Sequence, residues 1–504
     1  MQINVLEYLE NTVADTPDKP AYSDGEHGLT FRQTYGFAKS VGSFLAARGH
    51  RGEPVAVCMR KRPETAAAFF GVIYSGCFYV PFDDDIPRHR IEMIFENIQP
   101  HAAVCDSFML EYLKDLSYPC RLYDFNEICQ TPADEGLLLD IRAKAIDTDP
   151  IYTVFTSGST GMPKGVTACH RSVIDYIESL SETLMFDSGT VFGNQAPLYT
   201  DACLKDVYST IKNGATTYLI PKQLFMFPLK LIDFLNERRI NTICWVVSAL
   251  TMISGFDALQ KSVPRYLRLI AFGGEVFPMA QLNKWRAALP ETRFVNLYGP
   301  TEATGMSCYY DVDRDFGPGE TLPIGRPFRN TEILLLDDDG RIAGDGVAGE
   351  ICIRGTALTL GYWGDFSKTD ESFIQNPLNK SYHELIYRTG DIGKYNERGE
   401  LVFISRRDNQ IKHMGHRIEL GEIEAVAGKF DGIRSACCIF NSVQRKLILF
   451  YAGSRAEAEV AVYLKETLPR YMTPHSITQI SEMPLTANGK IDRNALAQET
   501  RGGS

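Results

Sequence analysis

The chain has 504 residues, of which 44% are hydrophobic and 23% charged, and its 52 basic and 63 acidic residues leave a net charge of −11. These proportions are those of a globular protein with a substantial core, and they exclude a disordered or fibrous chain. The net negative charge argues against nucleic acid as a partner, because binding a phosphate backbone requires a positive field.

The sequence offers no segment suited to secretion or to a membrane. Residues 1–20 alternate apolar and acidic residues and lack the basic and apolar regions of a signal peptide. Apolar runs such as LIAF and LILFYAG are much shorter than the ~20 residues that span hydrocarbon. The 12 cysteines show no CxxC spacing, which favours reduced, buried thiols. We therefore expect a cytoplasmic protein with no membrane partner.

From Pro54 to about Cys105, strand-like runs alternate with helical runs. The strand-like runs are PVAVCM, CFYVPF and AAVC, and the helical runs are PETAAAFFGVIYSG and RHRIEMIFENI. This alternation is typical of a parallel α/β sheet. It resumes after Asp149 with YTVF, TTYLIP, NTICWVV, RLIAF and FVNLYG. We expect a large α/β body of doubly wound sheets.

After about Gly317 the pattern changes to paired strands, with TEILLLDDDGRIA, GEICIRG and GKYNERGELVFI separated by turn residues. This stretch predicts a β subdomain. From Asp408 onward, a helix around 419–430, the strands SACCIF and KLILFYAG and the helix EAEVAVYLKETL indicate a compact α+β unit. We predict an N-terminal core over residues 1–407 and a small, mobile C-terminal lid over residues 408–504, joined by a short hinge.

A loop of glycines and hydroxyl residues follows the YTVF strand and reads TSGSTGMPKG. Small residues let backbone amides approach an anion, and hydroxyls and a lysine complete such a cradle. The loop is not a Walker A motif, because Lys164 follows Pro163 rather than glycine and no Ser or Thr comes next. Taken alone, it could equally be a flexible turn with a surface lysine.

Four further motifs occur downstream, namely NLYGPTE at 296–302, YRTGD at 387–391, RRDNQIKHMGHRIE at 406–419 and PLTANGKIDR at 484–493. Together with the Ser/Gly loop, they resemble the adenylate-forming superfamily. The resemblance is to the amino-acid-activating adenylation domains of nonribosomal peptide synthetases and to the D-alanine:carrier-protein ligases. It covers essentially the whole chain. It implies an enzyme, an AMP-forming ligase that makes an acyl adenylate from ATP and then transfers the acyl group to a pantetheine thiol of a carrier protein.

The resemblance also implies roles for individual residues. The residues expected to hold the β- and γ-phosphates of ATP are Thr156, Ser157, Gly158, Ser159, Thr160, Gly161 and Lys164. Thr301 would contact the α-phosphate, and Glu302 would bind Mg²⁺ as a hard oxygen ligand. Tyr298, next to Gly299, would stack on adenine.

In the same pattern, Asp391 would accept the ribose hydroxyls, assisted by Arg406. Lys490 of the lid would bridge the substrate carboxylate and the α-phosphate as a compact point charge. Asp408 would be the hinge. The chain departs from the pattern at Ser405, where the family usually has glycine before the arginine. Since serine is small, we expect only a local adjustment of the backbone.

The amino-acid pocket can be carried over in the same way, and nearly all of its residues are apolar. They are Asp201, Ala202, Lys205, Cys244, Ile270, Phe272, Gly273, Leu297, Gly305 and Met306. The resemblance assigns Asp201 to the α-ammonium of the substrate, although an aspartate there could also cap the helix that follows.

Lys205 distinguishes this pocket. Asp201 and Lys205 are four residues apart on an expected helix and would share a face. An unpaired ammonium in an apolar pocket is costly, so we expect an anionic substrate side chain, glutamate first and aspartate second. Alternatively, Lys205 could reach solvent or pair with Asp206.

D-Alanine is the second candidate substrate, although Gly273 stands where D-alanine ligases commonly have cysteine. A coenzyme A ligase is the nearest rival enzyme.

Overall fold

The structure is a computed structural model that describes residues 2–158, 161–317, 320–344, 346–408, 410–442, 444–485 and 491–499. The chain divides into two compact units. The first contains Met1–Asp83, Ile98–Val154 and Gly165–Arg407, and the second contains Asp84–Asn97, Phe155–Lys164 and the chain from Asp408 onward.

A seven-stranded sheet has the order β18-β8-β7-β4-β3-β5-β6, with parallel pairing among β3, β4, β5 and β6 and between β4 and β7. Every residue of β3, β4 and β5 is buried, as expected for strands covered on both faces. The strands are β3 (Pro54–Cys58), β4 (Phe78–Phe82), β5 (Ala102–Cys105), β6 (Arg121–Asp124), β7 (Pro150–Thr156), β8 (Lys164–Cys169) and β18 (Gly361–Tyr362).

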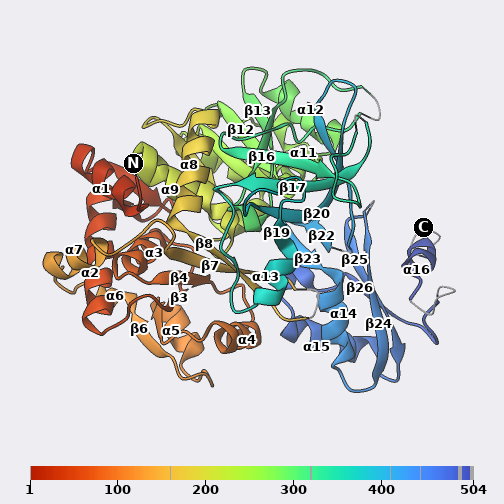
Figure 1. Cartoon of the computed structure of the whole chain (residues 1–504), viewed down its shortest axis with the longest axis horizontal. Helices are drawn as coiled ribbons and strands as arrows, with labels where there is room; N and C mark the ends of the chain where they lie inside the picture. Colours follow the sequence, from red (N-terminus) through yellow and green to blue (C-terminus); the bar gives the residue numbers. More distant parts are fainter. Residues whose placement is uncertain are drawn as a thin grey trace. The chain divides into compact units, whose positions relative to one another are not determined.

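The helices that follow these strands, or precede the sheet, are α1 (Leu6–Asp15), α2 (Phe31–Ala47), α3 (Pro63–Tyr74), α4 (Arg88–Ile98), α5 (Ser107–Leu113), α6 (Phe125–Ile128) and α7 (Glu135–Arg142). Helix α2 begins at a capping box, in which the Thr30 side chain accepts from the Gln33 amide. Helices α1, α2 and α3 pack on one another (Figure 1). The expected strand and helix runs between Pro54 and Cys105 are confirmed.

A nine-stranded sheet has the order β15-β14-β13-β12-β11-β9-β10-β1-β2, parallel from β13 to β1 and antiparallel at its two ends. Its strands are β1 (Pro20–Ser23), β2 (Gly28–Thr30), β9 (Val191–Asn194), β10 (Thr216–Leu219), β11 (Thr242–Val246), β12 (Leu269–Gly273), β13 (Arg293–Tyr298), β14 (Cys308–Asp311) and β15 (Arg326–Pro327). Its helices are α8 (His170–Leu184), α9 (Leu204–Asn213), α10 (Pro228–Glu237), α11 (Val247–Gly255) and α12 (Met279–Ala288).

The expected β subdomain is an antiparallel sheet of order β16-β17-β20-β19, with β21 paired to β20. It contains β16 (Thr331–Leu336), β17 (Gly349–Gly355), β19 (Phe373–Gln375), β20 (Leu385–Tyr395), β21 (Leu401–Arg406) and the helix α13 (Phe366–Ser372). A buried cluster joins it to the end of β13, because Tyr298 and Cys308 share a core with Ile351, Ile353 and Leu401. This core holds β13 and β21, which carry the candidate residues Tyr298 and Arg406, in one unit.

The second unit is α+β. It contains the hairpin β22 (Gln410–His413) and β23 (His416–Glu419), the sheet β24 (Ile433–Asn441), β25 (Lys446–Gly453) and β26 (Ser476–Gln479), and the helices α14 (Leu420–Gly428), α15 (Glu457–Thr467) and α16 (Arg493–Glu499). Its core is formed by residues of α14, β24, β25 and α15.

The large α/β body with a β subdomain agrees with the expected fold class. No helix within the described part of the chain is long and apolar enough to cross a bilayer.

Candidate active site

Asp391 and Arg406 face each other across two neighbouring strands. They are register partners in β20 and β21, and Nη1 of Arg406 donates to Oδ1 of Asp391. The hydroxyl of Tyr298 donates to Oδ2 of Asp391 at 2.6 Å. Burial, followed by the Asp391 charge, raises the pKa of the Tyr298 phenol well above its usual range, so this hydroxyl stays a donor. A buried carboxylate is thus oriented by an aromatic hydroxyl and a guanidinium.

Glu302 lies three residues beyond Gly299, in the short 3₁₀ turn Thr301–Ala303 that follows β13. Its side chain is fully buried, and Oε1 accepts a hydrogen bond of 2.7 Å from the hydroxyl of Tyr362. Among the described residues, no three His, Cys, Asp or Glu side chains cluster as a metal site. A single carboxylate nevertheless suits Mg²⁺, which usually takes one or two protein oxygens together with substrate phosphates and water.

Three glycines on or near β12 and β13 allow close packing that a side chain would block. A Cβ atom on Gly299 would lie 2.2 Å from the carbonyl oxygen of Gly305. Gly305 has a φ of +110°, and a Cβ there would meet the Tyr176 ring at 3.1 Å. Gly273 is equally restricted, since its Cβ would lie 2.4 Å from the Leu297 carbonyl oxygen.

The predicted amino-acid-pocket residues come from adjacent elements of the first unit. Cys244 lies on β11, Ile270, Phe272 and Gly273 lie on β12, and Leu297 lies on β13, so that strand pairing places Gly273 beside Leu297. The charge of Asp201 acts on both Tyr152 and Tyr176 and helps burial raise the pKa of each phenol. Neither phenol oxygen has a hydrogen-bond partner among the described residues.

The expected helix does not include Asp201. This residue begins a 3₁₀ turn, Asp201–Cys203, and α9 starts at Leu204. The capping alternative also fails, because Cys203 occupies the N-cap position of α9 and no side-chain cap is formed there. Asp201 and Lys205 therefore lie in two successive turns, a 3₁₀ turn that closes through a bond from the Cys203 amide to the Thr200 carbonyl and the first turn of α9, rather than in one regular α-helix.

Lys205 is in the first turn of α9, with 5% of its surface exposed. Its Nζ donates to the Ala202 carbonyl oxygen at 2.9 Å. Lys205 therefore points its ammonium at the backbone of the preceding turn rather than at solvent. Asp206 is fully buried and accepts at 2.6 Å from Nδ2 of Asn194.

The Ser/Gly loop lies in the second unit, beside α14 and the β22–β23 hairpin. Oγ of Ser157 donates to the Arg417 carbonyl and accepts from the Glu419 amide, and the Gly158 amide donates to Oε2 of Glu422 at 3.1 Å. The buried Oγ1 of Thr156 has no hydrogen-bond partner among the described residues.

The same loop packs tightly on its own backbone. A Cβ on Gly158 would lie 2.0 Å from the Met162 carbonyl, and Gly161 has a φ of +83°. The unpartnered hydroxyl of Thr156 fits a phosphate oxygen as its acceptor, while the Gly158 amide already donates to the carboxylate of Glu422. Lys164 begins β8. Ser159, Thr160 and Lys490 lie outside the described residues.

The hairpin after Asp408 has the two-residue turn Met414–Gly415, and both residues have positive φ, +52° and +80°. This is the conformation that tight hairpins of type I′ require, and it accounts for the glycine in KHMGHR. The carboxylate of Asp408 accepts from the Gln410 amide at 3.2 Å.

Sequence reasoning missed Tyr362, Tyr176 and Tyr152. Tyr362 bonds to Glu302 from a point 60 residues away, and the other two phenols lie within reach of the Asp201 charge. Each is an ordinary core tyrosine by its local sequence, so no local signal distinguishes it.

Comparison with known proteins places this geometry in a family. Residues 9–363 match the family described as AMP-binding enzyme. Tyrocidine synthase 2 of Brevibacillus parabrevis is 32% identical over 97% of this chain, which spans 13% of that protein. Delta-poly-L-ornithine synthetase of Acinetobacter baumannii (strain AB307-0294) is 31% identical over 98% of this chain, which spans 37% of that protein.

Among solved structures, IdnL1 superposes with a TM-score of 0.79 at 26% identity, covering 95% of this chain and 99% of that one. The chain belongs to the AMP-binding enzyme family. Its similarity to the two synthetases is confined to a region that makes up a minor part of those proteins.

Proposed function

We propose that this chain activates an amino acid as an aminoacyl adenylate, releasing pyrophosphate, and passes the aminoacyl group to the pantetheine thiol of a carrier protein. The observation that carries the proposal is the buried Asp391, oriented by Tyr298 and Arg406 in a member of the AMP-binding family. A carboxylate held in this way can accept two ribose hydroxyls, since each oxygen retains a free lone pair.

The other residues then take distinct roles. Thr156, Ser157, Gly158, Ser159, Thr160, Gly161 and Lys164 bind the β- and γ-phosphates, and Thr301 contacts the α-phosphate. Glu302 is the residue that would hold Mg²⁺, which supplies charge neutralisation for the attack of one anion on another. Tyr298, beside Gly299, packs against adenine. Lys490 contacts the substrate carboxylate and the α-phosphate from a C-terminal lid, residues 408–504, which turns at Asp408 on a core formed by residues 1–407.

For the substrate, we propose an amino acid with an acidic side chain, glutamate before aspartate. Asp201 binds the α-ammonium; at ~4 Å and an effective dielectric near 20, such a pair is worth about 4 kcal/mol before desolvation. Lys205 supports the acidic side chain, because a buried ammonium held by a backbone carbonyl gains from an anionic ligand. Of the remaining pocket positions, Ala202, Cys244, Gly273, Leu297, Gly305 and Met306 would surround the aliphatic part. Ile270 and Phe272 pack in a different buried cluster from Cys244 and Leu297, so they would not line the same pocket.

D-Alanine is the second candidate substrate, and Gly273 argues against it because a cysteine commonly narrows the pocket there in D-alanine ligases. A coenzyme A ligase would make its thioester without a carrier protein. Acyl transfer to free coenzyme A at a rate equal to carrier loading would favour that alternative.

The test is ATP–pyrophosphate exchange with a panel of amino acids, including both enantiomers of glutamate and aspartate. We expect L-glutamate to give the highest exchange. Dominant exchange with alanine or a large apolar amino acid would remove the role of Lys205, and no exchange with any amino acid would contradict adenylation itself.

The same assay tests Lys490. We expect Lys490→Ala to lower exchange by at least about two orders of magnitude, because the charge that neutralises the reacting anions is lost. Its thermal unfolding should match that of the unaltered chain. Near-normal exchange by the variant would overturn the assignment of Lys490.

A further inference from the structure

Charged side chains gather around Asp206 on α9, where Asp206 and Lys205 are buried and Lys61 is partly exposed. Oδ2 of Asp206 accepts from Asn194, while Oδ1 has no hydrogen-bond partner among the described residues. Asn194 also contacts Lys61, whose Nζ donates to the carbonyl oxygens of Asn194 and Gln195 at 3.0 and 3.1 Å. Apart from Lys205, none of these residues was singled out as a binding residue of the pocket.

Two cations act on Asp206, and no other charged group of the described chain is found to act on it. The Lys205 ammonium and the Lys61 ammonium each favour its ionised form, against the larger effect of burial. The remaining titratable groups that interact with Asp206 are Cys203, Cys244 and Tyr176, and burial raises the pKa of all three. They stay neutral near pH 7. The charged groups around this wall are therefore Asp206, Lys205 and Lys61, together with Asp201, whose charge acts on Cys203 and Tyr176, and the ion pair of Lys222 with Asp83, whose charges act on Lys61.

We propose that Asp206 is a positioning residue for substrate selection, a buried counter-charge to Lys205 that takes up a proton when an anionic substrate side chain binds. This inference rests on the proposed acidic substrate. Before binding, Asp206 balances Lys205. Once a substrate carboxylate lies against Lys205, two carboxylates share the same cations, and like charges in a buried site do not both remain ionised. The proton goes to Asp206, whose Oδ1 accepts no other donor of the described chain.

The pH dependence follows from which groups titrate near neutrality. Burial raises the pKa of Asp206 from 3.8 to about 6, and burial lowers the pKa of Lys61 from 10.5 to about 7. The bound carboxylate raises the pKa of Asp206 further. The complex therefore binds more protons than the free enzyme above about pH 6, and affinity for the anionic substrate falls as the pH rises.

The experiment measures the ratio of kcat/KM for glutamate to kcat/KM for glutamine at each pH. Glutamine lacks the side-chain charge, so the effects of pH on ATP, Mg²⁺ and the α-amino group cancel in this ratio. For the unaltered chain, we expect the glutamate-to-glutamine ratio to be level below about pH 6 and to fall by up to about tenfold per pH unit above it. In Asp206→Asn, which keeps the shape and a hydrogen-bond acceptor for Asn194, the ratio should be level and about tenfold higher at about pH 8.

A second variant separates the effect of Lys61 from that of Asp206. Lys61→Met removes a cation that lowers the pKa of Asp206. The glutamate-to-glutamine ratio should therefore still fall with pH, and the fall should begin at higher pH. If the fall instead disappears in Lys61→Met and persists in Asp206→Asn, Lys61 is the titrating group and the proposal is wrong.

Proton uptake gives a readout that does not depend on turnover. Calorimetry of glutamate binding in two buffers of different ionisation enthalpy should show up to about one proton taken up near pH 7, none for glutamine, and none for glutamate in Asp206→Asn. A preference for glutamate that is identical in Asp206→Asn and the unaltered chain at every pH would overturn this inference alone. No preference for glutamate over glutamine at any pH would overturn the acidic-substrate proposal and this inference with it.

Discussion

At the scale of single residues, the hydrogen bond from Tyr298 to Asp391 can be removed without removing the charge of the carboxylate that it orients. In Tyr298→Phe the ring remains and the donor is lost, so Asp391 keeps Arg406 but loses the phenol that orients its second oxygen. A hydrogen bond to a charged group is worth about 1.5–3 kcal/mol. We expect the KM for ATP in pyrophosphate exchange to rise by about tenfold or more.

The matched control is Tyr310→Phe, since Tyr310 also donates to a carboxylate, that of Glu400, at 2.8 Å. Tyr310 has no proposed role in ATP binding. A KM for ATP that rises equally in both variants would indicate a general loss of packing rather than a role for Tyr298.

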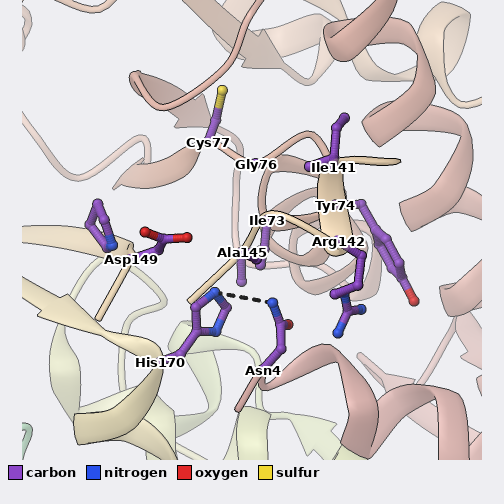
Figure 2. Close-up of a pocket in the computed structure, with 11 residues that line it drawn as sticks. Asn4, Ile73, Tyr74, Gly76, Cys77, Ile141, Arg142, Ala145, Asp149 and His170 are labelled. Atoms are coloured by element: carbon purple, nitrogen blue, oxygen red, sulfur yellow. Dashed lines mark hydrogen bonds between the residues drawn. The ribbon is translucent and has the colours of Figure 1, made fainter. Parts of the chain in front are cut away.

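At the scale of elements, His170 joins the start of α8 to the segment before α1. Its Nδ1 accepts from the Val5 amide at 3.2 Å, and Asn4 lies against Nε2 at 3.4 Å, at the edge of a small pocket (Figure 2). Burial, and secondarily the Arg142 charge, lowers the pKa of His170 from 6.5 to about 3. The folded chain therefore binds fewer protons than the unfolded chain between these values.

The stabilising effect of neutral His170 is present above pH 6.5 and is lost as the pH falls toward 3, at about 1.4 kcal/mol per pH unit. We expect acid to destabilise the unaltered chain more than His170→Gln, which keeps an acceptor for Val5 and carries no charge. Thermal unfolding of both proteins at about pH 7 and about pH 5 measures the difference. Equal shifts in the two proteins would show that folding does not lower the pKa of His170, contrary to this prediction.

The elements also show what local sequence can predict. The runs that became β3, α3, β4, α4 and β5 are predictable because short apolar strand runs alternate with longer helical runs. The turn at Asp201 was not predictable in this way, since a 3₁₀ turn and the first turn of a helix share the same polar pattern. Asp206 and Lys61 are typical surface residues by local sequence, and only the fold buries Asp206 and brings Lys61 near it.

At the scale of the whole molecule, the second unit is assembled from segments that are distant in sequence, and this could not be predicted from any local pattern. Arg90 of α4 donates to Oε1 of Glu422 on α14, and the Gly158 amide donates to Oε2 of the same carboxylate. Only 1% of the Glu422 side chain and 8% of the Arg90 side chain are exposed. One buried ion pair thus joins the three segments of this unit.

Removing one partner of this pair should cost far more than removing both. In Arg90→Met the Glu422 carboxylate stays buried without its guanidinium, a change that typically costs about 3–5 kcal/mol. Arg90→Met combined with Glu422→Leu replaces two charges by apolar groups of similar size, so most of that loss should be recovered. Hydrogen exchange of the α14 amides measures the opening free energy of this unit directly. A double variant as unstable as Arg90→Met would mean that the pair fixes the geometry of the Gly158 loop rather than compensating a buried charge.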